Sequence, residues 1–101
     1  MIIDLEAFFP LKNISIYKAY VFGGYLVDNN SKDIDLLVIS EDFEGVSRLK
    51  RNEKVNLNFS SKLIDPVCLT VKEYERLVQE KSVFLNMILA NASKIYERDF
   101  N

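Results

Sequence analysis

The spacing of apolar residues divides the chain into short strand-like and helix-like segments. Residues 14–22 begin with alternating apolar and polar positions and end as a continuous apolar run, which predicts a strand that enters the core as it proceeds. Residues 33–40 and 62–69 predict two further strands. The first of these two is apolar on both faces over its second half, so we expect it to lie in the centre of a sheet, covered on each side.

The remaining segments predict helices, a last strand and loops. Helices are predicted at residues 3–12, 47–55, 70–79 and 82–92, and a last short strand at residues 94–96. A loop is predicted at residues 41–45, and a strand or a helix end at residues 56–61. Strands and helices alternate without a repeat or a linker. The sequence therefore predicts one α+β domain over residues 1–101, a small mixed sheet with helices packed on it.

The predicted helix over residues 47–55 carries most of its charge on one side. Leu49 is expected on one side, and four basic residues mostly on the other: Arg48, Lys50, Arg51 and Lys54. Charge on one helix face is usually the solvated face, and that is our expectation here. The alternative is that these side chains attract an acidic partner or a nucleic acid.

The predicted helix over residues 82–92 is apolar nearly all round. One sheet face requires only a stripe of apolar side chains. Either the helix is buried between the sheet and the chain termini, or part of it is exposed as a contact surface, for a protein partner or a homo-oligomer.

Composition and charge exclude several classes of function. The chain has 101 residues and no histidine, which excludes Ser–His and Cys–His catalysis and imidazole-rich zinc sites. The single cysteine, Cys68, excludes an internal disulfide, and we expect it to be a core residue rather than a nucleophile. The formal net charge of -2 provides no global positive field, so long DNA or RNA is a weak candidate substrate.

We expect a cytoplasmic protein without a membrane segment. Asp4 and Glu6 interrupt the apolar run that a signal peptide would need at the N-terminus. The longest apolar stretches are too short to span a bilayer.

Two short motifs on neighbouring predicted strands carry the candidate chemistry. Asp33 and Asp35 open the strand over residues 33–40, and their side chains share a face because side chains alternate along a strand. Adjacent anions are costly unless a cation lies between them, and carboxylate oxygens favour magnesium or manganese. Gly23 and Gly24 follow the preceding strand, where glycine lets the backbone approach a phosphate closely. The combination indicates an enzyme that handles nucleotides.

Each motif alone is common, in tight turns or at strand ends, but together they are more specific. Phe22-Gly23-Gly24, followed after eight residues by Asp33-Ile34-Asp35-Leu36, resembles the signature of the DNA polymerase beta superfamily of nucleotidyltransferases. The resemblance is to its small members, the minimal nucleotidyltransferases. It implies a third carboxylate on a later strand, and Asp65 fits that position.

The resemblance implies an activity and a set of site residues. The activity is Mg²⁺- or Mn²⁺-dependent transfer of a nucleoside monophosphate, AMP by expectation, from ATP or another nucleoside triphosphate to a hydroxyl of a protein or other acceptor. Asp33, Asp35 and Asp65 would be the catalytic and metal-binding residues. Asp65 would otherwise be an ordinary acid at a strand edge.

The implied nucleotide-binding residues lie around the glycine pair. The backbone N–H groups of Gly23 and Gly24 would bind the triphosphate at a helix N-terminus. Tyr25 would pack on the base or ribose, and Lys32 would contact a phosphate or Asp33. The alternatives are that Tyr25 packs in the core and that Lys32 is a solvated loop residue.

Similar minimal nucleotidyltransferases are often antitoxins of small helical HEPN-type toxins, which implies such a protein partner here. Three features differ from the family pattern: a short stretch between Gly24 and Asp33, Val27-Asp28 where an Arg-Gly pair is usual, and Lys32 where Ser is common. They leave two alternatives open. One is a catalytically degenerate subunit that acts by protein–protein interaction, and the other is a phosphate- or metal-binding module without transferase ancestry.

Overall fold

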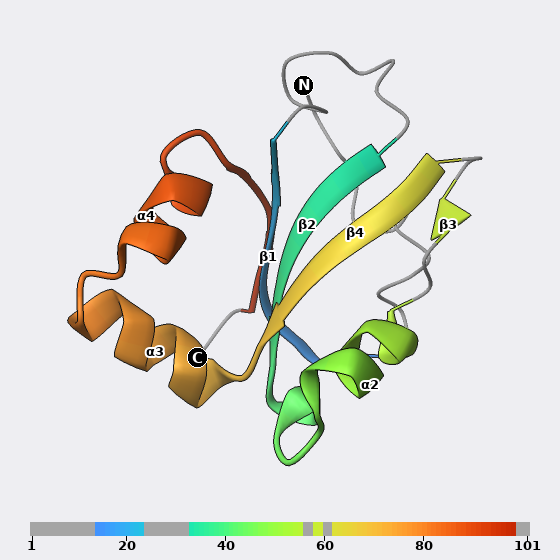
Figure 1. The fold of residues 1–101 in the computed structure, drawn as a ribbon, viewed down its shortest axis with the longest axis horizontal. Coiled ribbons are helices and arrows are strands. Elements are labelled where there is room, and N and C mark those ends of the chain that lie inside the picture. The colour runs from blue at the N-terminus through green and yellow to red at the C-terminus, as the bar shows by residue number, and fades with distance from the viewer. Residues whose placement is uncertain (1–13, 24–32, 56–57, 60–61, 99–101) are drawn as a thin grey trace.

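A five-stranded mixed sheet forms the centre of the fold (Figure 1). The computed structural model describes residues 14–23, 33–55, 58–59 and 62–98. The strands are β1 (Ile16–Phe22), β2 (Asp33–Ser40), β3 (Asn58–Phe59), β4 (Lys62–Leu69) and β5 (Ser93–Glu97). Their order across the sheet is β3-β4-β2-β1-β5. Only β2 and β4 pair in parallel, whereas the other three strand pairs are antiparallel. The predicted α+β fold with a mixed sheet is confirmed.

β2 lies in the middle of this sheet, as its apolar sequence predicted. Every side chain from Leu36 to Ser40 is buried. Ile34, Leu36 and Val38 join one apolar cluster, and Leu37 and Ile39 join a second one on the opposite face. The strand is therefore covered on both sides, which is why its sequence is apolar without alternation.

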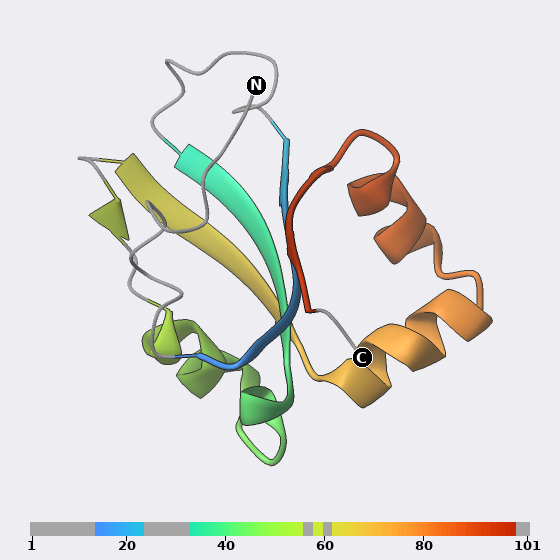
Figure 2. The same ribbon diagram turned by 180° about the vertical axis from the view of Figure 1, so that it is seen from behind.

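The helices cover both faces of the sheet. They are the one-turn 3₁₀ helix η3 (Glu41–Phe43), α2 (Arg48–Lys54), α3 (Val71–Gln79) and α4 (Val83–Leu89). Figures 1 and 2 show α3 and α4 on one side of the sheet and α2 on the other. None of the described helices is long and apolar enough to cross a membrane.

Most predicted elements are confirmed, with differences at their ends. The helix predicted at residues 3–12 and the turn after Gly23 lie outside the described residues. The segment predicted as a loop at residues 41–45 contains η3, which places Phe43 in the core. The helix predicted to reach residue 92 ends at Leu89, because the chain must turn there to enter β5.

The prediction for the charged face of α2 is wrong at two positions. Leu49, expected on the inner side, is 82% exposed, and Arg51, expected in solvent, is 7% exposed. The Arg51 guanidinium donates two hydrogen bonds to the Glu73 carboxylate, at 2.7 and 3.2 Å, and further ones to the carbonyls of Val46 and Cys68. Arg51 therefore joins α2 to β4 and α3.

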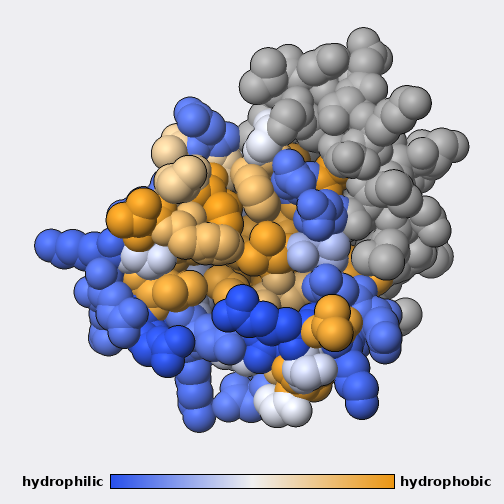
Figure 3. Space-filling view, viewed as in Figure 1, coloured by the Kyte–Doolittle hydropathy of each residue, from blue (hydrophilic) through white to orange (hydrophobic). Residues whose placement is uncertain are grey.

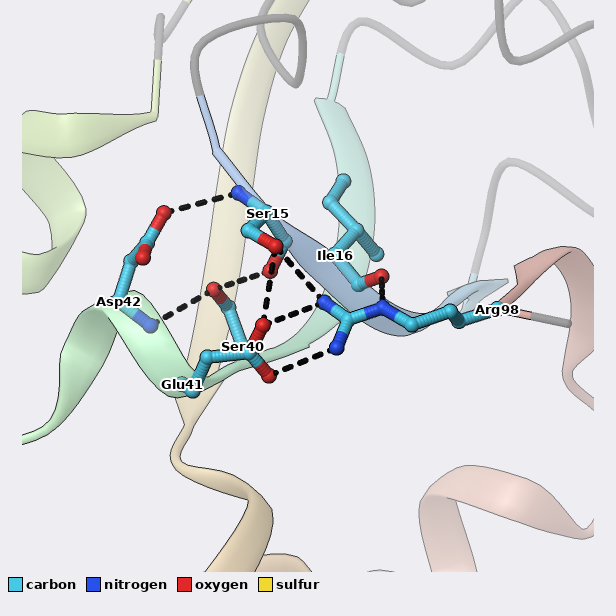
Figure 4. Close-up of polar contacts among 6 residues, drawn as sticks. All are labelled: Ser15, Ile16, Ser40, Glu41, Asp42 and Arg98. Atoms are coloured by element: carbon cyan, nitrogen blue, oxygen red, sulfur yellow. Dashed lines mark hydrogen bonds and ion pairs between the residues drawn. The ribbon is translucent and has the colours of Figure 1, made fainter. Parts of the chain in front are cut away.

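A second polar network fixes the end of β5 to the start of β1 (Figure 4). Arg98 donates to both carboxylate oxygens of Glu41, to the Ser15 hydroxyl and to the Ile16 carbonyl. Asp42 accepts from the backbone N–H of Ser15 at 2.8 Å. The hydrogen bonds from Arg98 lower the pKa of Glu41. These contacts bring together segments more than eighty residues apart, at the end of the sheet away from the candidate site.

Candidate functional site

The parallel ladder between β2 and β4 places two of the three predicted carboxylates side by side. Asp35 pairs with Asp65 in the register. Neighbouring strands lie roughly 5 Å apart and paired residues project to the same face, so the two acids share one face of the sheet. Asp35 is half-buried and Asp65 is exposed. Two anions at this spacing repel one another, and a cation that both can reach would remove that cost.

Gly23 packs directly against the carboxylate of Asp35. β1 ends at Phe22, which pairs with Asp35, and Gly23 follows with a φ of +76°. A Cβ added at Gly23 would lie 2.2 Å from Oδ2 of Asp35 and 3.1 Å from its Cγ. Glycine is therefore required at this position for two reasons: the backbone is in the left-handed region, and the Asp35 carboxylate occupies the space that a Cβ would need.

Gly23→Ala will displace the Asp35 carboxylate, because the new methyl group overlaps Oδ2. On the expectation that this site binds ATP with magnesium, the substitution will weaken that binding by about tenfold or more. The positive φ adds a cost of about 1 kcal/mol to folding. Calorimetric titration with ATP and magnesium measures the first effect, and denaturant unfolding measures the second. Gly45→Ala is the matched control. Gly45 also has a positive φ of +72°, but a Cβ there meets nothing within 4 Å. Equal losses of binding in both variants would contradict the close packing of Gly23 on Asp35.

The other predicted site residues are only partly described. Asp33 is the first residue of β2 and pairs with Leu63 in the register, and its side chain lies outside the description. Gly24, Tyr25 and Lys32 lie outside the described residues altogether. Among the side chains that are described, no group of three or more possible metal ligands occurs. The structure thus brings together Gly23, Asp35 and Asp65.

The donor set at this site suits a hard divalent cation. Both described side chains are carboxylates, and oxygen ligands are those that magnesium and manganese prefer. A Cβ at Gly23 would overlap the Asp35 carboxylate, so the glycine leaves the space that this carboxylate occupies. The residues present therefore fit a magnesium or manganese ion.

The one cysteine plays no part in this chemistry. Cys68 is buried, and burial raises the pKa of its thiol to about 12. The thiol is neutral at physiological pH and is not a nucleophile. The expectation that Cys68 is a core residue is confirmed.

A family model described as a nucleotidyltransferase domain matches residues 5–93. This match spans most of the chain, including all three strands that carry the candidate site. The chain belongs to the nucleotidyltransferase domain family. No curated protein and no solved structure matches it significantly.

Sequence reasoning did not find the role of Arg51 in supporting this nucleotidyltransferase domain. Arg51 holds the Cys68 carbonyl of β4, three residues after Asp65. A signal was present in the spacing, because Val55 is four residues later and is 1% exposed. Residues four apart lie on the same side of a helix, so an inward Val55 directs Arg51 inward as well.

Proposed function

We propose that this chain is a magnesium-dependent nucleotidyltransferase that moves a nucleoside monophosphate, AMP by preference, from a nucleoside triphosphate to a hydroxyl of a protein or other acceptor. The observation that carries the proposal is the pairing of Asp35 with Asp65 on parallel strands, with Gly23 packed against Asp35. Membership in the nucleotidyltransferase domain family supports the general reaction.

In this proposal each site residue has a defined role. Asp33 and Asp35 would hold the ion that accompanies the triphosphate. Asp65 would help to hold a second ion and would accept the proton of the attacking hydroxyl, while pyrophosphate leaves. Bound ions would supply charge stabilisation to the attacking and leaving oxygens. The backbone N–H groups of Gly23 and Gly24 would donate hydrogen bonds to the triphosphate, because glycine lets the backbone approach a phosphate closely. Tyr25 and Lys32 lie next to these residues in sequence and would contact the nucleotide.

The partner proposed for this activity is a protein. Similar minimal nucleotidyltransferases are often antitoxins that act on small HEPN-type toxins, and the net charge of -2 disfavours a long nucleic acid as acceptor. A toxin–antitoxin role in the cytoplasm is therefore our proposed context.

A second candidate function is a binding subunit that has kept the fold and lost catalysis. Only eight residues separate Gly24 from Asp33, and Val27-Asp28 stands where the family usually has Arg-Gly. A short turn and a missing guanidinium would both weaken the hold on a triphosphate.

Thermal unfolding with and without nucleotide distinguishes these functions. The transferase proposal predicts that ATP with magnesium raises the midpoint of the parent chain by several degrees, about 2.7 kcal/mol at a ligand concentration of a hundred times Kd. We expect neither ligand alone to do so. Asp35→Asn should remove the shift, whereas Glu75→Gln, an exposed carboxylate on α3, should keep it.

The other results are equally informative. If ATP with magnesium does not stabilise the parent, the binding subunit is the better account. Stabilisation by magnesium alone, without preference for a triphosphate, would indicate a metal-binding module instead.

A further inference from the structure

A cavity of about 480 Å³ lies along the outer edge of β4, between α2 and the pair α3 and α4. Its lining includes Val67 of β4, Leu77 of α3 and Phe84 of α4, together with Arg48 and Leu49 of α2. Figure 3 shows apolar side chains gathered on this face between the two sets of helices. A cavity of about 150 Å³ already holds a benzene ring, so this one admits more than one large apolar side chain.

The apolar surface continues beyond the cavity. Phe84 is 50% exposed and Leu49 is 82% exposed, and both line it. Val83 and Met87 on α4 are also largely exposed. Of the two alternatives for this helix, burial between the sheet and the termini or exposure of part of it, the structure shows partial exposure. Exposed apolar side chains beside an apolar cavity are typical of a contact site.

The edge of β4 is not suited to the addition of another strand. Within the described residues, β3 pairs only with Lys62 and Leu63, so the rest of that edge has no strand partner. The Cys68 carbonyl points outward and accepts a hydrogen bond from Arg51 at 3.2 Å. Pro66 lies two residues earlier, on the same side of the backbone, and has no N–H to donate. An added strand would meet a missing donor and an occupied acceptor, which favours a helix as the occupant.

The charge next to the cavity is positive. Arg48 of α2 is exposed and forms no ion pair with another described residue, and it is the charged side chain among the residues that line the cavity. Lys50 and Lys54 lie on the side of α2 away from the cavity. The charge at the cavity is therefore that of a cation, although the whole chain has a net charge of -2. Charge complementarity indicates an acidic occupant.

We propose that the cavity binds an amphipathic helix of a partner protein. The apolar face of that helix packs on Val67 and Phe84, and an acidic side chain on its flank pairs with Arg48 of α2. Val67 lies two residues from Asp65 on the same face of β4, so a helix bound there passes beside the candidate site. The binding does not depend on catalysis, and it applies to an active transferase and to a binding subunit alike.

A synthetic helical peptide tests the proposal on the full chain. The peptide has about 18 residues, long enough to form a helix, with leucines at positions i, i+4 and i+7 and glutamates beside them. Titration of the ¹⁵N-labelled chain should shift the amide signals of the cavity residues, with a Kd in the micromolar range. We expect Arg48→Glu to raise that Kd about tenfold and Phe84→Ala to raise it by a similar factor.

The controls distinguish the contribution of charge to peptide binding from that of apolar contact. In Arg48→Glu, a peptide with lysines in place of the glutamates should bind better than the acidic one. Arg76→Glu reverses an exposed charge on α3 outside the cavity lining and should leave the Kd within about twofold. A peptide with serines in place of the leucines should not bind.

Four results would overturn the proposal. The first two are an absence of shifts at the cavity residues up to about 1 mM peptide and equal binding of the serine peptide and the leucine peptide. The other two are stronger binding of a single-stranded oligonucleotide than of the peptide, and self-association of the chain that Phe84→Ala abolishes. The last would assign the cavity to a second copy of this chain.

Discussion

Asp35→Asn will lower the rate of nucleotidyl transfer by a factor of about 10³ or more while leaving the fold intact. Asp35 lies next to Asp65 in the register and against the backbone of Gly23, so its carboxylate is at the centre of the described site. Asparagine has nearly the same shape but removes the negative charge on which an ion depends. The measurement is transfer of label from α-labelled ATP, with magnesium, to proteins of a host lysate.

The comparison of three variants makes this prediction specific. Asp65→Asn should cause a loss of similar size, because it removes the second carboxylate of the pair, and Glu75→Gln should leave the labelled band unchanged. Circular dichroism and the unfolding midpoint check that each variant is folded. A labelled acceptor that persists at the parent level in Asp35→Asn would exclude Asp35 from the chemistry. A parent chain that labels nothing would favour the binding subunit.

The strands were predictable because the positions of their apolar residues indicate which side chains are buried. β2 and β4 have the bounds that the sequence predicted, and β2 lies in the centre because nothing polar interrupts it between Leu36 and Ile39. Thr70 and Ser82 also begin their helices as capping residues. These features depend on local preferences and on the alternation of side chains, which a single sequence contains.

The register that pairs Asp35 with Asp65 could not be predicted from the apolar pattern. A pattern of apolar residues predicts two strands but not which residues pair, because register depends on contacts between distant segments. The sequence suggested Asp65 as a third acid only through the family resemblance, and the ladder then places it beside Asp35. The catalytic roles of Asp33, Asp35 and Asp65 remain predictions.

Burial of a charged side chain was the least predictable feature. Arg51 was assigned to solvent because charged residues on one side of a helix usually mark its solvated face. Its partner, Glu73, is twenty-two residues away and belongs to another helix. Glu73 also accepts from the Thr70 N–H and so completes the capping box of α3. Nothing local in the sequence of α2 indicates this pairing.

Arg51→Met will destabilise the domain by about 3 kcal/mol, the second large effect that we predict. Methionine fills much of the volume but leaves the Glu73 carboxylate without its guanidinium and the Val46 and Cys68 carbonyls without a donor. A domain of this size is stable by only about 5–15 kcal/mol, so a loss of this size is readily measured by urea unfolding. Arg48→Met, an exposed arginine on the same helix, should cost less than about 0.5 kcal/mol.

The pH dependence of this loss of stability tests whether the Arg51–Glu73 ion pair causes it. Hydrogen bonds from Arg51 lower the pKa of Glu73 from its usual value of 4.5. Because this pKa is lower in the folded than in the unfolded chain, ionisation of Glu73 stabilises the folded protein at pH values above 4.5. This stabilisation is lost as the pH falls through the lowered pKa of the folded state. The difference in stability between the parent and Arg51→Met should therefore be largest near neutral pH and shrink below pH 4.5. A difference that stays constant across this range would mean that Arg51 acts through packing and its hydrogen bonds to the Val46 and Cys68 carbonyls rather than through the ion pair.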